Sequence, residues 1–202
     1  MFINTLVTNP VYFFRFVVII IFSIVLHELA HGWAAMSQGD DTPEKTGHLT
    51  LNPVIHMGWE SIIFLCLAGI CWGQMPVNPS KFRSPKWGNI LVSAAGPFSN
   101  LVLGILFSML LKVYSNPIHS GFLSVNFLDM AAHINLTLFL FNLLPIPPLD
   151  GFHIYSEIFP ELKQLENTQF GLFALMLIFI DPGFGAALGL IADLIIEVIV
   201  GR

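Results

Sequence analysis

The sequence of 202 residues carries few charges for its length. Only 10% of its residues are charged, 55% are hydrophobic, and the mean hydropathy is +0.76. A soluble domain has about a quarter of charged residues, so the composition excludes an ordinary soluble protein and indicates an integral membrane protein. The net charge is −5 with eight Lys and Arg residues. We therefore expect no basic surface and no binding of nucleic acid.

Three apolar runs have about the 20 residues that a membrane-spanning helix needs. They cover residues 11–36, 87–111 and 127–144. The first contains only Arg15 and Glu28 as formal charges, and the second contains none. These runs predict an all-α integral membrane protein with a core of three transmembrane helices. No repeat, linker or low-complexity tract divides the chain, so we expect residues 1–202 to form a single domain.

Two other apolar stretches are harder to assign. Residues 61–72 are too few to span a bilayer and favour a re-entrant or shallow element. They include Cys66 and Cys71, which lack CxxC spacing and are expected to be buried free thiols. Residues 169–200 are numerous enough, but Asp181-Pro182-Gly183 interrupts them. One broken helix, two short helices and a hairpin all fit this C-terminal segment.

The polar connections give weaker signals. Residues 47–51 alternate in polarity, which is a weak strand signal, and Asn52-Pro53 ends it. Residues 74–86 carry Lys81, Arg83 and Lys86 without an acidic residue, so the positive-inside tendency places this loop in the cytoplasm.

The motif His27-Glu28-Leu29-Ala30-His31 lies toward the end of the first predicted helix. Residues four apart face the same side of a helix, so both imidazoles can bind one zinc ion. Glu28 lies beside this pair, where it can act as the general base for water activated by the metal. Ionisable residues at membrane depth are costly and usually functional, which favours a metal site over a chance match.

A catalytic zinc takes a third protein ligand and keeps one position open. Asp150 is the first candidate, because Pro145, Pro147 and Pro148 fix an irregular segment before it and Gly151 follows it. Irregular backbone survives in a bilayer only where it is buried in protein or lines a wet cavity. The alternative for Asp150 is a helix cap, and His153 is a second candidate for the ligand.

Two further features within the predicted helices remain open. Asn142 is a polar residue in an otherwise apolar run, where it either bonds a neighbouring helix or orients a substrate backbone or oxyanion near the metal. Residues 96–100, Gly-Pro-Phe-Ser-Asn, break up the second predicted helix, and such small residues commonly permit close helix packing.

Three motifs together resemble the site-2 protease family of intramembrane zinc metalloproteases. They are HELAH on the first hydrophobic helix, AAGPFSN in the middle of the chain, and NLLPIPPLDG after it. The stretches GHLTLNPVIHMG and MPVNPSKFRSPKWG resemble the short prokaryotic branch of that family, which lacks PDZ and CBS domains. HExxH alone is common to many zinc proteases, whereas its combination with a distal NxxPxxxLDG is much more specific.

The resemblance implies a role for each matching residue. His27, His31 and Asp150 would bind one Zn²⁺ per chain, Glu28 would activate water, and Asn142 would help to position the substrate. It also implies three core transmembrane helices, with a small sheet-like element expected within residues 37–72. An exposed strand edge near residues 49–51 would hold the unwound substrate.

The expected function is that of a zinc-dependent endopeptidase that cleaves in or near transmembrane segments of membrane proteins. The expected location is a prokaryotic cell membrane, which the chain crosses several times in contact with lipid. The sequence does not indicate an oligomeric state. Two alternatives are a proteolytically inactive relative that binds transmembrane segments and a membrane metal transporter.

Overall fold

The computed structural model describes residues 1–114, 124–166 and 169–201. Within them the regular elements are α-helices and short 3-10 helices, and these described residues contain no β-strand. The helices are α1 (Asn4–Thr8), α2 (Pro10–Ser37), α3 (Thr42–Lys45), α4 (Pro53–Ala68), η1 (Pro79–Lys81), α5 (Pro85–Tyr114), α6 (Val125–Asn142), α7 (Asp150–Ile158), η2 (Pro160–Leu165), α8 (Phe170–Ile180) and α9 (Pro182–Val200). The all-α fold class is confirmed.

Local signals fix where the long helices begin and end. The Asn9 side chain accepts a hydrogen bond from the Tyr12 N–H, and Pro10 occupies the first turn of α2, where a missing N–H costs nothing. After Ser37 the chain turns at Gly39, whose φ of 97° lies in the region that favours glycine. Pro85 likewise opens α5.

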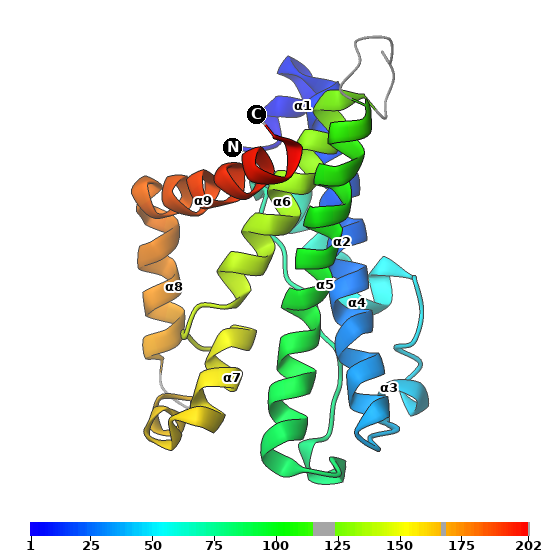
Figure 1. Ribbon diagram of the computed structural model, residues 1–202, viewed down its shortest axis with the longest axis vertical. Helices are drawn as coiled ribbons and strands as arrows, with labels where there is room; N and C mark the ends of the chain where they lie inside the picture. The colour runs from blue at the N-terminus through cyan, green and yellow to red at the C-terminus, as the bar shows by residue number, and fades with distance from the viewer. Residues whose placement is uncertain (115–123, 167–168, 202) are drawn as a thin grey trace.

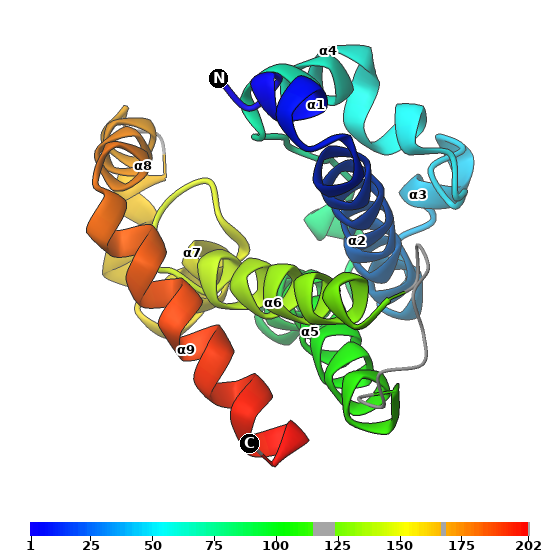
Figure 2. The same cartoon turned by 90° about the horizontal axis from the view of Figure 1, so that it is seen from above.

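The helices α2, α5 and α6 pack against one another and form the centre of the molecule (Figure 1). α1 and α4 cover one side of α2, whereas α8 and α9 lie on the far side of α6 (Figure 2). α5 and α6 approach closely at Gly104, because a Cβ there would meet Leu136 Cγ at 2.7 Å. The two termini lie at the same end of the bundle (Figure 1).

The outer faces of the bundle are as apolar as its interior. Ile20, Leu111 and Leu136 belong to a buried cluster that joins α2, α5, α6 and α9. Large apolar side chains are also exposed on the outside of α2 and α5, including Phe14, Phe22, Phe98, Val102 and Met109. An exposed apolar surface of this extent is unfavourable in water but favourable in contact with lipid. The protein is a membrane protein.

Length and composition select a different third candidate for a membrane-spanning helix than the predicted one. By length and composition the candidate spans are Pro10–Ser37, Pro85–Tyr114 and Gly183–Val200. The predicted third run, residues 127–144, does form a helix, α6, but Asn126, Asp129 and Asn135 lower its hydropathy. α9 meets the criterion, yet it runs across one end of α5 and α6 instead of alongside them (Figure 1).

The structure shows which elements the remaining apolar stretches form. The C-terminal segment is two helices, α8 and α9, and the Asp181 side chain caps α9 by accepting from the Gly183 N–H at 2.9 Å. Residues 61–68 belong to the short helix α4, which ends at Gly69, and the chain then extends over residues 70–78. Cys66 and Cys71 are free thiols, but each is only half-buried. Residues 49–51 form bends, so the predicted strand near these residues is wrong.

Candidate metal centre

Helix α2 presents its two histidines to one point inside the bundle. His27 and His31 are 5% and 8% exposed, and their Nε2 atoms lie 3.0 Å apart. The four-residue spacing places both rings on one face of the helix, as the sequence predicts.

Asp150 meets these histidines from the opposite side. It is the first residue of α7, directly after the proline-rich turn. Its Oδ2 lies 3.1 Å from His27 Nε2, and its Oδ1 lies 3.4 Å from His31 Nε2. Three ligands about 2.1 Å from a tetrahedral zinc ion lie about 3.4 Å from one another. The separations in this cluster are therefore close to those of a three-ligand zinc site.

The other nitrogen of each ring has a partner that orients it. His31 Nδ1 lies 2.7 Å from the backbone oxygen of Val92, and His27 Nδ1 lies 2.6 Å from Asn100 Oδ1. A carbonyl oxygen only accepts, so both Nδ1 atoms carry a proton, and the lone pair of the neutral ring lies on Nε2. Each imidazole thus offers Nε2 to the shared point, as a metal ligand requires.

Two glycines leave room for this arrangement. A Cβ on Gly96 of α5 would collide with the Nε2 atoms of both His27 and His31. A Cβ on Gly73, in the extended segment, would collide with the Glu28 carboxylate. The small residue at position 96 therefore serves close approach to the imidazoles, whereas the sequence suggested helix packing.

Glu28 lies beside the cluster in a cavity of about 440 Å³. It is 7% exposed, and the cavity contacts α2, the extended segment, α5 and α7. Asn142 and His153 also line this cavity. The Asn142 Nδ2 donates to the Leu138 backbone oxygen of its own helix at 3.0 Å, and the described part of the chain shows no bond from it to another helix.

The structure brings together His27, His31 and Asp150 as a group able to hold a metal ion, without His153. The ligating atoms of the three residues lie within 4.8 Å of one another. The structure thus favours Asp150 over His153 as the third ligand. The sequence drew attention to residues 96–100, but only as a packing motif and as part of the family resemblance, and it did not single out Gly73 or Asn135. The available signal for a role of Asn100 and Asn135 beside the site was the presence of asparagines within apolar helices.

Buried polar contacts hold the segment that covers the cavity. Asp40 is fully buried directly after α2, and its carboxylate accepts from the backbone N–H groups of Thr42 at 3.0 Å and Asn78 at 2.6 Å. Burial opposes ionisation, but these bonds and the nearby Lys81 ammonium outweigh it and lower the pKa of Asp40. The extended segment is therefore fixed to the end of α2.

A second contact holds α7 against α5. Glu157 of α7 accepts from Asn89 Nδ2 at 2.9 Å and from Lys163 Nζ at 2.8 Å. Burial opposes ionisation of Glu157, but the bonds from Lys163 and Asn89 prevail and lower its pKa. Helix α7, which begins with Asp150, is thus held against α5 by Glu157, seven positions after Asp150.

Comparisons with a family model and with known proteins indicate the same family. The model of Peptidase family M50 matches residues 15–124 and 112–180. The chain is 38% identical over 175 residues to "Putative zinc metalloprotease YwhC" of Bacillus subtilis, covering 82% of this chain and 80% of that protein. It is 32% identical over 173 residues to "Putative zinc metalloprotease Rip2" of Mycobacterium tuberculosis, covering 79% of this chain and 64% of that protein.

A more distant relative is "Zinc metalloprotease MJ0392" of Methanocaldococcus jannaschii, which is 24% identical over 154 residues. Those residues cover 76% of this chain and 37% of that protein. No solved structure matches the chain significantly. From the family match and the identity to these relatives, together with the His27–His31–Asp150 cluster, the chain belongs to peptidase family M50, the site-2 proteases, and is a metalloprotease.

Proposed function

We propose that this protein is a zinc-dependent endopeptidase that hydrolyses peptide bonds within or next to the transmembrane segments of membrane proteins. The observation that carries the proposal is a three-ligand cluster with a buried glutamate inside a helix bundle whose outer faces are apolar. Such a site serves a substrate that reaches it through the membrane.

His27, His31 and Asp150 would hold one zinc ion per chain. Zinc, when bound, supplies Lewis-acid activation of water and of the scissile carbonyl. Glu28 takes a proton from the attacking water and delivers it to the leaving amine, so the carboxylate is restored at the end of the reaction. Gly73 leaves the space beside the Glu28 carboxylate free, because a side chain at that position would collide with it.

The extended segment is suited to hold an unwound substrate. Trp72 exchanges hydrogen bonds with the Ser61 hydroxyl, and the Gln74 N–H bonds to the His56 oxygen. Within the described residues, the backbone groups of the alternate positions Gly73 and Met75 have no such partner, and both residues line the metal cavity. An extended peptide can pair with these groups as an added strand. The Asn142 side chain lies at the same cavity, where its amide would help to orient the substrate.

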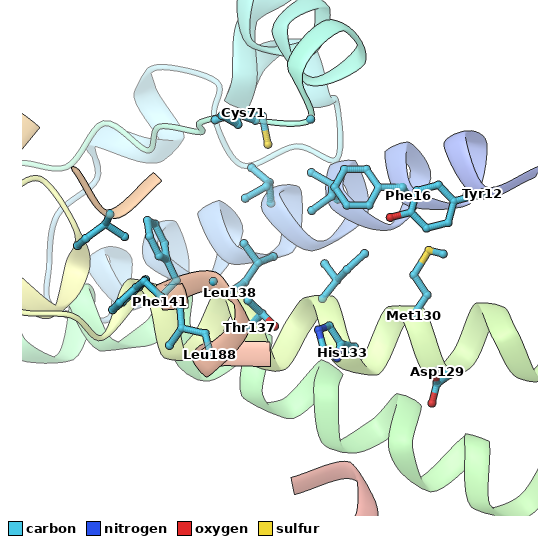
Figure 3. A pocket seen from close by; sticks show the side chains of 18 of the residues that line it. Tyr12, Phe16, Cys71, Asp129, Met130, His133, Thr137, Leu138, Phe141 and Leu188 are labelled. Carbon is cyan, nitrogen blue, oxygen red and sulfur yellow. The ribbon is translucent and has the colours of Figure 1, made fainter. Parts of the chain in front are cut away.

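A second cavity supports entry from the membrane. It has about 700 Å³ and lies between α2, α6 and the α8–α9 pair, where Tyr12, Phe16 and Met130 line it (Figure 3). Ile24, Cys71, Leu138 and Phe141 line both this cavity and the metal cavity. An apolar segment of a membrane protein would thus reach the metal from the side, with lipid around the bundle. The relatives point to a prokaryotic cell membrane as the location.

Substitution of the proposed base tests the function. Glu28→Gln keeps the size of the side chain but cannot accept the proton, so we expect retained zinc and loss of cleavage of model transmembrane substrates. Glu60→Gln, on α4 outside the cavity, is the matched control and should cleave normally. Wild-type turnover by Glu28→Gln would refute the assignment, and wild-type protein without bound zinc would refute the metal site.

A further inference from the structure

Two asparagines are fully buried where α5 and α6 pack together. Asn100 of α5 and Asn135 of α6 have no exposed surface, although apolar residues surround this part of the bundle. Burying an amide without hydrogen bonds costs about 1–3 kcal/mol in proteins. Such residues need either a packing reason or a functional one, and their hydrogen bonds point to a functional one.

The hydrogen bonds of the pair form a continuous chain that ends at His27. Asn135 Nδ2 donates to the Ala131 backbone oxygen at 2.8 Å, and Asn100 Nδ2 donates to Asn135 Oδ1 at 3.2 Å. Asn100 Oδ1 then accepts from His27 Nδ1 at 2.6 Å. Every oxygen in this chain accepts and every nitrogen donates.

The backbone at the far end fixes the direction of the whole chain. The Ala131 carbonyl can only accept, so the NH₂ group of Asn135 must face it and Oδ1 must face Asn100. Asn100 must then present its NH₂ group to Asn135 and its oxygen to His27. That oxygen requires a proton on His27 Nδ1, so the lone pair of the neutral ring lies on Nε2, which faces the point shared with His31 and Asp150.

We propose that Asn100 and Asn135 are positioning residues that set the tautomer and the ring orientation of His27 for metal binding. This inference rests on the proposed function, because it gives His27 the role of a zinc ligand. His31 obtains the same support from the Val92 backbone oxygen. The orientation of His27 is supported by two side chains, Asn100 on α5 and Asn135 on α6. It therefore depends on the contact between those two helices.

Zinc affinity of the purified protein in detergent, measured by competition with a chelator, tests the roles of both residues. Asn100→Leu removes the acceptor at nearly constant volume and should weaken binding by about 10–100-fold, the usual cost of losing such a partner. Asn135→Leu should weaken it less, because Asn100 can still reach His27. Asn100→Asp keeps the acceptor oxygen for His27 although it loses the donor to Asn135, so it should bind zinc more tightly than Asn100→Leu.

The double variant and a control separate positioning from packing. Because Asn135 acts through Asn100, the double Leu variant should bind zinc no more weakly than Asn100→Leu alone, whereas independent effects would add. Ser108→Ala is the control, since Ser108 is also buried on α5 but its hydroxyl donates to the Gly104 oxygen of its own helix. Its zinc affinity should be unchanged. Wild-type affinity in Asn100→Leu, or additive losses, would overturn the proposal.

A measurement without zinc distinguishes failure of this inference from failure of the proposed function. ¹⁵N NMR of histidine-labelled, metal-free protein should show a protonated Nδ1 on His27 in the wild type and in Asn100→Asp. That signal should change in Asn100→Leu but not in Ser108→Ala. An unprotonated Nδ1 in the wild type would refute the hydrogen-bond chain whatever the zinc result. A protonated Nδ1 in a protein that binds no zinc would refute the metal site alone.

Discussion

At Gly96 a single added carbon atom would displace both imidazoles. The Nε2 atoms of His27 and His31 occupy the place of a Cβ, and neither ring can retreat without breaking its Nδ1 bond to Asn100 or Val92. We expect Gly96→Ala to lower zinc affinity by at least about tenfold, within the range for disturbed metal-site partners. Chelator competition measures this loss.

The control for this variant is another helical glycine with open space around it. A Cβ on Gly185 in α9 would meet no atom within 4 Å, so Gly185→Ala should leave zinc affinity unchanged. Equal affinities for the two alanine variants would contradict the close approach at Gly96.

The sequence predicts the site best where spacing along one helix determines geometry. His27 and His31 follow from four-residue spacing, whereas Asp150 lies 119 positions beyond His31 (150 − 31) and needs the packed bundle to reach them. The stiffness of the proline-rich turn made Asp150 a candidate ligand, but spacing alone did not distinguish a metal ligand from a helix cap. Asn100 and Asn135 have no sequence relation to His27 at all, since only the packing of three helices brings them together.

At the scale of elements, Asp40 decides how firmly the extended segment is held over the cavity. Its folded-state pKa is lowered, so its stabilising contribution is complete above the unfolded pKa of about 3.9 and is lost as the pH falls through the lower folded value. Asp40→Asn should therefore reduce protection of the Asn78 amide at pH 7 by about 1–3 kcal/mol. In the Asp40→Asn variant, protection of the Asn78 amide should also fall less on acidification than it does in the wild type.

Hydrogen exchange measured by mass spectrometry over residues 74–83 tests this expectation. Glu44→Gln, at an exposed position of α3, is the control and should leave the exchange unchanged. Equal exchange in Asp40→Asn and wild type at pH 7 would show that the segment is held by other contacts.

Apolar runs predicted where helices form but not how each one lies. Residues 127–144 and residues 183–200 are similar in length, and hydropathy alone ranks the second as the better span. The structure places the more polar helix, α6, at the centre, where Asn135 accepts a hydrogen bond from Asn100 of α5 and His133 pairs with Asp193 of α9. Composition records how apolar a helix is, whereas its orientation depends on which neighbours cover its polar groups.

At the scale of the whole molecule, α9 lies across the bundle, so both of its ends should be at one depth. Ala186 and Val198 are twelve positions apart, which is about 18 Å along a helix. Spin labels on Ala186→Cys and Val198→Cys, in a chain with Cys66 and Cys71 replaced by alanine, should report similar depths in a bilayer. Phe14→Cys and Trp33→Cys on α2 provide the contrast, since these residues are exposed at opposite ends of an upright helix. A difference of about 18 Å between the α9 labels would show that α9 spans.

The separation of Asp150 from the histidines has a consequence for biosynthesis. α2 leaves the ribosome with His27 and His31, but the metal site is incomplete until α5, α6 and the turn before α7 have followed. A nascent or partly inserted chain thus has a weak two-ligand site, and tight metal capture coincides with completion of the bundle. The membrane is therefore not exposed to a working protease before the fold that confines it exists.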